Sequence, residues 1–168
     1  IVADVPILKV NENNENEGIK GVTFRLYGTS NYDKKVDEYV TSDNEGQVIF
    51  KGIEAGEYIL QEYEATPDWV EDHTEHRVQI TNKAEVYIDD ELISNISSKK
   101  ITNKPRAHTD VVFTKRNSLT KARISGAKFK LSGTSNYGNE ILMYGVSDEN
   151  GDVKFEDIEY GTYDLKEI

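Results

Sequence analysis

Hydrophobic and polar residues alternate along several short stretches of the chain, as they do in β-strands that bury one face. In "VTFRLYG" (22–28), Phe24 and Leu26 lie on one side of an extended chain and Arg25 lies on the other. Turn phrases such as "SDNEGQVIF" (42–50) separate these stretches, and their glycine supplies the positive φ of a tight turn. Further stretches of strand character are "AKFKLSG" (127–133), "HRVQI" (76–80), "AEVYID" (84–89) and "KKITN" (99–103). Short strands at this spacing predict an all-β protein made of small β-sandwiches.

The strand pattern occurs twice, because the chain contains an internal repeat. Residues 21–62 align without a gap to residues 126–167, and about half of the aligned positions are identical. The phrase "NKPRAHTD" (103–110) has the proline and polar residues of a short linker between domains. We therefore expect two tandem domains, one complete at 1–105 and a second at 106–168 that lacks its C-terminal strands.

The composition of the chain excludes several kinds of partner and site. The 168-residue chain carries a net charge of −11, which makes nucleic acid and anionic membranes poor partners. No apolar run approaches the length of a membrane span, so no membrane insertion is expected. The chain has no cysteine, which excludes disulfides and thiolate metal sites. His73 and His76 lie among carboxylates but match a metal site poorly, so neither a metal nor a cofactor is expected.

A glutamate falls on the inward face of the same strand in both repeats. The phrase "GEYILQE" (56–62) returns as "GTYDLKE" (161–167). In the second copy the alternation places Leu165 and Glu167 on the inward face, and Glu62 holds the equivalent position in the first. The pattern therefore predicts a buried carboxylate at one step of the strand, twice.

A lysine and an asparagine also fall on inward faces. Lys9 and Lys115 each follow two apolar residues of the same parity, and Asn103 shares a face with Ile101. One interpretation is an ordinary lysine–glutamate ion pair near the sandwich rim, with Asn103 beginning the linker. The other depends on burial, which favours a neutral amine and a protonated acid. A neutral lysine is a nucleophile, and an adjacent acid can polarise a carboxamide and transfer protons, so that an amide forms and ammonia leaves.

The motifs resemble the B-type repeat of Gram-positive collagen adhesins and pilins, the Cna-B domain. The matching phrases are the strand-borne lysine, "G-[AV]-x-F-x-L", "D-x-x-G", "G-x-Y-x-L-x-E" and "T-N-K". The resemblance covers 1–105 and the front part of a second repeat to 168, and it implies Ig-like or transthyretin-like sandwiches. It also implies a self-formed isopeptide bond between lysine and asparagine, assisted by the glutamate.

Transferred by position, the resemblance assigns the crosslink to Lys9 and Asn103 and the catalytic role to Glu62. The second repeat offers Lys115 as the crosslinking residue and Glu167 as its catalyst, with no asparagine in view. The phrase "ITNK" occurs at both 80–83 and 101–104, so Asn82 is an alternative acceptor for Lys9. Asn103 is preferred because it ends the last strand before the linker.

The expected function is mechanical: a stalk or shaft module of a cell-wall-anchored adhesin or pilin on the bacterial surface. The chain would not be an enzyme beyond a single autocatalytic crosslink. Its expected partners are neighbouring pilin subunits or host extracellular matrix. One alternative is a ligand-binding module for a host matrix protein or glycan, although the sequence shows no exposed aromatic row. Another is an accessory domain of an enzyme, such as the transthyretin-like modules of carboxypeptidases.

Overall fold

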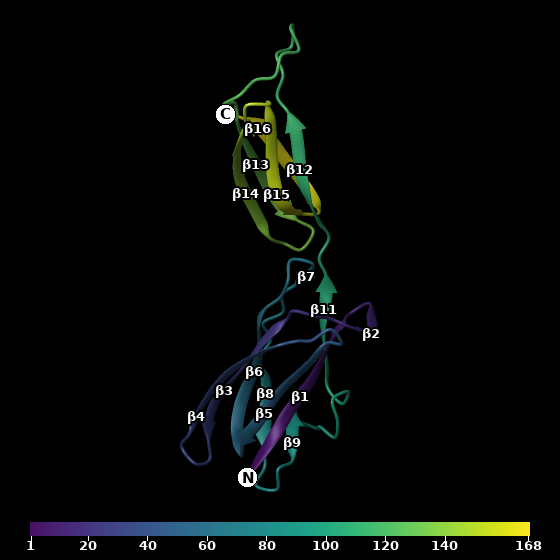
Figure 1. Cartoon of the computed structure of the whole chain (residues 1–168), viewed down its shortest axis with the longest axis vertical. Coiled ribbons are helices and arrows are strands. Elements are labelled where there is room, and N and C mark those ends of the chain that lie inside the picture. Colours follow the sequence, from purple (N-terminus) through teal and green to yellow (C-terminus); the bar gives the residue numbers. More distant parts are fainter. The chain divides into compact units, whose positions relative to one another are not determined.

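The computed structural model describes all residues, Ile1–Ile168, and consists of strands joined by turns and loops (Figure 1). The all-β fold class predicted from the sequence is confirmed. The chain forms two compact units, Ile1–Pro105 and Arg106–Ile168, which are described separately. The structure contains no helix that is long and apolar enough to cross a membrane.

The first sheet of the first unit is organised around its first strand. β1 pairs with β5 from Val2 to Leu8 and with β2 and β11 near its C-terminal end, and β7 pairs with the end of β11. The strands of this sheet are β1 (Val2–Asn11), β2 (Asn14–Gly18), β5 (Gln47–Glu54), β7 (Trp69–Val70) and β11 (Lys100–Pro105).

The second sheet of this unit has six strands in the order β10-β9-β8-β6-β3-β4. They are β3 (Thr23–Ser30), β4 (Lys35–Thr41), β6 (Gly56–Glu64), β8 (His76–Ile80), β9 (Val86–Ile88) and β10 (Glu91–Leu92). β6 lies between β3 and β8, so the strand that carries Glu62 is central rather than at an edge. β6 pairs with β3 along its whole length and with β8 from Gly56 to Leu60.

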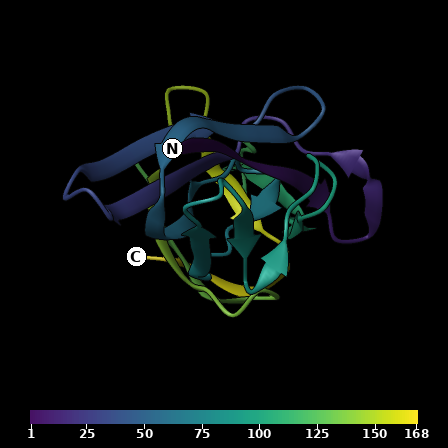
Figure 2. The same ribbon diagram turned by 90° about the horizontal axis from the view of Figure 1, so that it is seen from below.

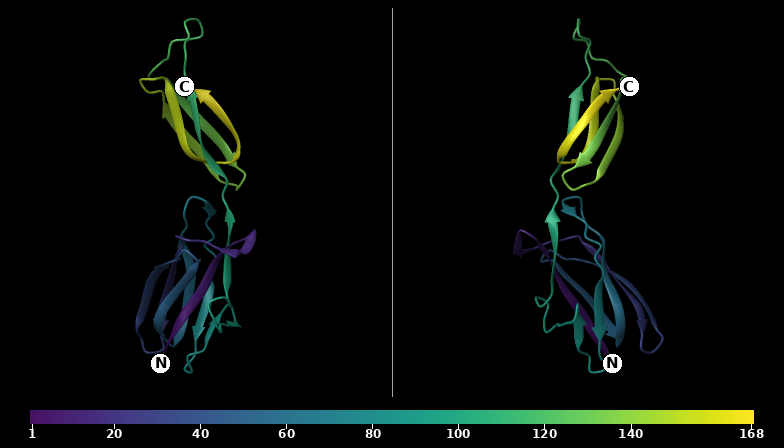
Figure 3. Two further views of the ribbon diagram at one scale, coloured as in Figure 1. Left: turned by 45° about the vertical axis from the view of Figure 1, so that its right-hand side comes forward. Right: turned by 180° about the vertical axis from the view of Figure 1, so that it is seen from behind.

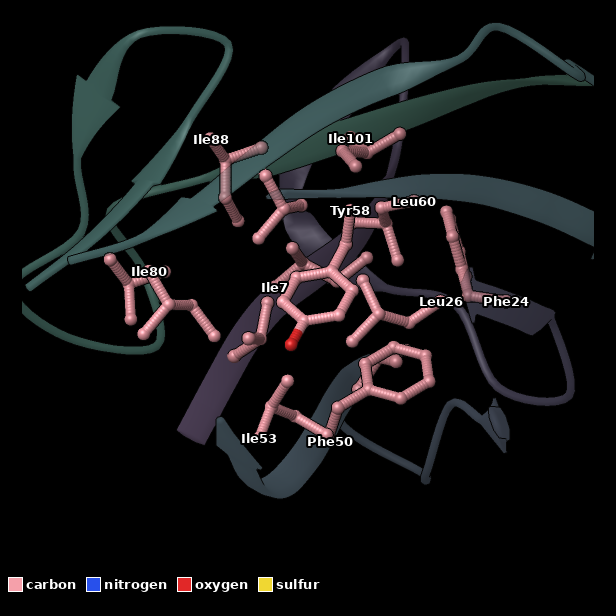
Figure 4. Packing of buried hydrophobic residues seen from close by; sticks show 14 of the residues in the cluster. Ile7, Phe24, Leu26, Phe50, Ile53, Tyr58, Leu60, Ile80, Ile88 and Ile101 are labelled. Atoms are coloured by element: carbon pink, nitrogen blue, oxygen red, sulfur yellow. The ribbon is translucent and has the colours of Figure 1, made fainter. Parts of the chain in front are cut away.

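The inward faces of the two sheets form one hydrophobic core (Figure 4). Figure 4 shows the Tyr58 ring among aliphatic side chains, with Ile7 and Phe50 from the first sheet and Leu26 from the second. The Tyr58 hydroxyl donates a 2.7 Å hydrogen bond to the Glu54 carbonyl oxygen, so its polar tip is satisfied. Burial of such side chains stabilises a fold by about 1.5–3 kcal/mol each relative to exposure.

β1 and β11 are parallel neighbours although they are the first and last strands of the unit. Their register pairs Lys9 with Ile101 and Asn11 with Asn103. Figure 3 shows β1 in purple and β11 in teal within this unit. The β1–β2 hairpin, whose β2 residues are mostly exposed, projects from the unit in Figure 2. The pairing places the second half of the first strand beside the last strand of the unit in one sheet.

The second unit repeats five of these strands with the same pairings. One sheet contains β12 (His108–Thr114) and β15 (Asp152–Glu159), and the other has the order β14-β13-β16. The latter strands are β13 (Lys128–Ser135), β14 (Glu140–Val146) and β16 (Gly161–Glu167). The β12–β15 register shifts between Thr109 and Val111, as β1–β5 does between Ala3 and Val5.

The core of the second unit is smaller than that of the first. Its buried members are Phe129, Leu131, Val153, Phe155 and Ile158. Residues 106–168 hold no strands equivalent to β8, β9 and β11, so parts of the inward faces of β12 and β16 remain uncovered.

A buried polar cluster fixes the start of the second unit. Glu159 is 6% exposed and accepts hydrogen bonds from Ser135 Oγ at 2.8 Å and Asn139 Nδ2 at 2.8 Å. The Arg106 Nε–H donates to the other carboxylate oxygen at 2.5 Å. Burial acts to raise the pKa of Glu159, but the hydrogen bonds from Asn139, Arg106 and Ser135 outweigh it, and the pKa is lowered.

Candidate functional site

Lys9 is fully buried in the first unit, with a relative exposure of 0%. It follows Val5 and Ile7 on the inward face of β1, and both of these are also buried. The alternation that places two apolar side chains in the core therefore places the lysine there as well. Its ammonium nitrogen lies 5.4 Å from the centre of the Phe24 ring, which borders it on the core side.

Glu62 faces Lys9 from the opposite sheet. It is 1% exposed and continues the inward row of Tyr58 and Leu60 on β6. Its Oε1 atom lies 3.0 Å from Lys9 Nζ. The carboxylate and the amine are thus in direct contact in the interior, where an unpaired charge would cost several kcal/mol.

Asn103 completes the group from β11. It is 2% exposed, and its Oδ1 atom accepts a hydrogen bond from Lys9 Nζ at 2.5 Å. Lys9 Nζ also donates to the carbonyl oxygen of Thr102 at 3.1 Å. The Nδ2 atom of Asn103 is buried and has no hydrogen-bond partner, which is uncommon for a side-chain amide in a protein interior.

The buried environment favours the neutral form of Lys9. Burial lowers the pKa of Lys9 from its ordinary value, while the negative charges of Glu62 and Asp72 act in the opposite direction. The proton of the ammonium group has an acceptor 3.0 Å away in Glu62 Oε1. Transfer of that proton would give a neutral amine beside a carboxamide, which is the arrangement that amide exchange needs.

A polar segment that the strand pattern does not assign to the site lies against Glu62. The backbone N–H of Asp72 donates to Glu62 Oε2 at 3.0 Å. The Nδ1–H of His73 donates to the backbone oxygen of Glu62 at 2.8 Å, and this hydrogen bond is the main cause that raises the pKa of His73. These contacts come from a loop without periodicity, and the sequence gives no signal for them.

Asn82, the alternative acceptor, lies elsewhere. It is exposed and occupies the turn between β8 and β9, whereas Lys9 is buried on β1. The hydrogen bond of Lys9 to an asparagine goes to Asn103. The geometry therefore favours Asn103 over Asn82 as the partner of Lys9.

Lys115 and Glu167 also meet in the second unit, but near its surface. Lys115 Nζ lies 2.8 Å from Glu167 Oε1, and the two side chains are 32% and 50% exposed. The expectation of a second buried carboxylate is wrong, because the Glu167 side chain is 50% exposed, and Leu165 on the same face is 47% exposed. Strand parity selects the inward face correctly, but burial needs a second layer over that face. No hydrogen bond joins Lys115 to an asparagine.

Two exposed tyrosines, Tyr39 and Tyr63, contact each other on the outer face of the six-stranded sheet, although the sequence pattern shows no exposed aromatic row. The rings of Tyr39 and Tyr63 make an edge-to-face contact with centroids 5.0 Å apart. The Arg25 guanidinium lies 4.1 Å from the centre of the Tyr27 ring and binds Asp37 through Nε at 2.8 Å. These residues come from neighbouring strands, so their proximity depends on the β3–β4 and β3–β6 registers.

Comparison with protein families identifies the class of the chain. The model of the SpaA family, described as a prealbumin-like fold domain, matches residues 3–92 and 109–168. These two segments make up most of the chain, and the chain therefore belongs to this family. The resemblance to Cna-B-type domains seen in the sequence is confirmed at the level of family and fold. A search of curated proteins found no match.

Solved structures share the fold at low sequence identity. A streptococcal ancillary pilin is 21% identical, with a TM-score of 0.56 over 99% of this chain and 53% of that chain. The shaft pilin SpaA from Lactobacillus rhamnosus GG is 14% identical, with a TM-score of 0.50 over 100% of this chain and 87% of that chain. The chain thus spans about half the length of the streptococcal pilin. Similarity at this level of identity concerns the fold alone.

Proposed function

We propose that this chain is a structural stalk or shaft module of a Gram-positive pilin or surface adhesin, stabilised by a self-formed amide between Lys9 and Asn103. The observation that carries the proposal is the buried contact of Lys9 Nζ with Glu62 Oε1 at 3.0 Å and with Asn103 Oδ1 at 2.5 Å. The three residues come from three strands and two sheets, so only the folded unit assembles them. Membership of the SpaA family supports a structural rather than an enzymatic role.

The reaction uses only groups of the chain. Lys9 Nζ first transfers a proton to Glu62, and the neutral amine then attacks Cγ of Asn103. The carboxylic acid donates a hydrogen bond to the developing oxyanion on Oδ1 and passes its proton to Nδ2. The Cγ–Nδ2 bond breaks, ammonia leaves, and the second amine proton of Lys9 is released through the carboxylate. The products are one new amide bond and one molecule of ammonia, with no oxidant or cofactor.

The position of the bond fits a load-bearing role. It would join β1 to β11, the first and last strands of the unit, so tension would pass through a covalent path instead of unzipping the sheet. Lys9 and Asn103 are 94 residues apart. In the loop-entropy model used for disulfides, closing a loop of this size stabilises the folded state by about 4–5 kcal/mol. For a chain without cysteine, the amide would take the place of a disulfide.

We extend the proposal to the organisation of the whole chain. Residues 1–105 form a complete Cna-B-like domain, and residues 106–168 belong to a second domain with Lys115 and Glu167 in the roles of Lys9 and Glu62. The 2.8 Å contact between Lys115 and Glu167 supports this assignment. In this proposal the protein lies outside the cell, is anchored to the wall and has neighbouring pilin subunits as partners.

One observation favours a second candidate function, a ligand-binding module for a host matrix protein or glycan. Tyr39 and Tyr63 are 50% and 57% exposed and stand together on one sheet face. Exposed aromatic rings can stack on sugars or peptide side chains. Binding to a glycan array or to matrix proteins that is lost in a Tyr39→Ala, Tyr63→Ala double variant would support this function. No binding by the wild-type chain would exclude these ligands.

Intact mass spectrometry of the purified chain tests the crosslink. We expect the mass to be lower than the sequence mass by one ammonia, and digestion to yield one branched peptide that contains both Lys9 and Asn103. A chain of full sequence mass that yields separate, unlinked peptides would refute the mechanism.

A further inference from the structure

The loop that follows β6 is attached to both of the strands that supply Glu62 and Asn103. β7, at residues Trp69–Val70, pairs with β11 in a register that places Val70 opposite Lys104, the residue after Asn103. A few residues later, the loop returns to β6 and donates the Asp72 N–H to Glu62 Oε2 at 3.0 Å. The loop therefore spans from the acceptor strand to the carboxylate strand.

Several further contacts hold residues 71–74, named here the 71–74 clasp, against β6. The side-chain amide of Gln61 donates to the backbone oxygen of His73 at 2.7 Å. The Nδ1–H of His73 donates to the backbone oxygen of Glu62 at 2.8 Å, and the N–H of Ala65 donates to Glu71 Oε2 at 2.6 Å. Residues on both sides of Glu62 are thus fastened to the clasp.

The side chain of Asp72 fixes the direction of the Asp72 N–H bond. Asp72 Oδ1 accepts the Thr74 N–H at 3.0 Å and the Thr74 Oγ1–H at 2.6 Å, which closes a turn over residues 72–74. This turn fixes the peptide group that points toward Glu62. Asp72 can therefore influence Glu62 through the backbone even though its carboxylate is turned to Thr74.

The two oxygens of the Glu62 carboxylate have different surroundings. Oε2 accepts the Asp72 N–H, whereas Oε1 lies 3.0 Å from Lys9 Nζ and has no other hydrogen-bond donor. With Oε2 occupied by an N–H donor, a proton taken from Lys9 would reside on Oε1, the oxygen that lies 3.0 Å from Lys9 Nζ. A carboxylate free to rotate would present either oxygen.

We infer that the 71–74 clasp orients the Glu62 carboxylate through the Asp72 N–H, so that Oε1 faces Lys9 and Asn103, and that this orientation sets the rate of crosslinking. Asp72 is then a positioning residue for the reaction. The inference rests on the proposed function for its reaction, but the orientation of Glu62 is a property that can be measured without it.

The rate is measured on the full chain, recovered unfolded and then diluted from denaturant, by following the loss of ammonia with mass spectrometry. We expect Asp72→Ala to slow the loss by roughly tenfold to a hundredfold, the range for a misplaced catalytic group. Asp72→Asn, which keeps the Oδ1 acceptor, should recover most of the rate. Asp43→Ala is the matched control, because Asp43 Oδ1 closes a similar turn with the N–H groups of Glu45 and Gln47 in the connection between β4 and β5.

A spectroscopic measurement follows the orientation independently of the reaction. In a Lys9→Ala background, which cannot crosslink, the Asp72 amide proton should resonate downfield and move upfield when Glu62→Ala is added. The Glu45 amide proton, which is bound to Asp43, should not respond. The stabilities of Asp72→Ala and Asp43→Ala, measured in the same background, show whether the two turns contribute equally to folding.

The outcomes separate the alternatives. Equal crosslinking rates for Asp72→Ala and Asp43→Ala would overturn the inference. Faster crosslinking in both Asp72→Ala and Asp72→Asn would also overturn it, because that result would indicate a purely electrostatic effect of Asp72 on Lys9. If the wild-type chain keeps its ammonia, the proposed crosslink fails. In that case the chemical shift of the Asp72 amide proton still tests the orientation of Glu62. A chemical shift that does not change when Glu62 is removed overturns the proposed orientation, and an upfield change supports it.

Discussion

Lys9 Nζ lies 2.5 Å from Asn103 Oδ1, although 94 residues separate the two positions in the sequence. The contact depends on the parallel pairing of β1 and β11, which places Lys9 beside Ile101 and Asn11 beside Asn103. Glu62 reaches the same point from the facing sheet. A lysine, an acid and a carboxamide therefore meet in the interior of a fold that has few other buried polar side chains.

The first prediction concerns the role of Glu62. Glu62→Ala should leave the first unit folded and restore the missing ammonia, because the proton acceptor and donor for the reaction is gone. The matched control is Glu64→Ala, which removes an exposed carboxylate two residues further along β6. Intact mass distinguishes the two variants. Crosslinking of the Glu62→Ala chain at the wild-type rate would show that Glu62 is not the catalyst.

The second prediction concerns stability. Lys9→Ala should lower the thermal midpoint sharply, because it prevents the bond, which the loop-entropy model values at about 4–5 kcal/mol, and leaves the buried Glu62 carboxylate without a cationic partner. The variant should also become sensitive to trypsin. Lys34→Ala, which removes a side chain that is 65% exposed, should change stability by less than about 0.5 kcal/mol. Equal losses in the two variants would mean that Lys9 contributes no more than a surface lysine.

The third prediction concerns the number of crosslinks. Lys115 contacts Glu167 and no asparagine, so this chain should lose one ammonia and not two. Restoring whatever natural sequence follows Ile168 should allow a second loss if it supplies a strand that ends in a "T-N-K"-like phrase. Mass spectrometry of both chains checks the prediction. Two losses from residues 1–168 alone would mean that Lys115 reacts with an acceptor inside this chain.

The fourth prediction concerns the pH dependence of the second unit. The pKa of Glu159 is lowered in the folded state, so its contribution to stability is present above its ordinary value of 4.5 and is lost as the pH falls through the folded pKa. Hydrogen exchange of peptides from 106–168, measured between neutral and acidic pH, should show this loss of protection. Glu159→Gln should be less stable at neutral pH and should lose part of the pH dependence. An unchanged pH profile in Glu159→Gln would assign the effect to other carboxylates.

Strand parity predicts much of the fold and of the first site. It places Lys9, Glu62 and Asn103 on inward faces, because each continues a row of apolar side chains that must enter a core. It also predicts that Leu165 and Glu167 face inward, but it does not report whether another sheet covers them. Burial of a strand face depends on residues far away in the sequence, and for β16 that covering layer is not formed by residues 106–168.

The contacts of the 71–74 clasp show what the sequence pattern does not contain. Asp72 and His73 lie in a polar stretch without a period, and their roles arise from backbone groups that any residue possesses. The contact between the two tyrosines on the outer face cannot be predicted from the sequence for a related reason. Tyr39 and Tyr63 belong to strands that flank β3, and their contact follows from the pairing register rather than from spacing along the chain.

The parallel register of β1 and β11 also bears on how far the protein can be stretched. With Lys9 and Asn103 joined, a pull on the two ends of the first unit extends only the short tails outside the bond. The 94-residue interval between them, roughly 310–340 Å when fully extended, stays out of the load path. In a filament of such units, the total chain length that cannot extend would be this interval multiplied by the number of units. The fibre would then behave as a nearly inextensible cord rather than a spring, and single-molecule pulling would register the difference as missing contour length.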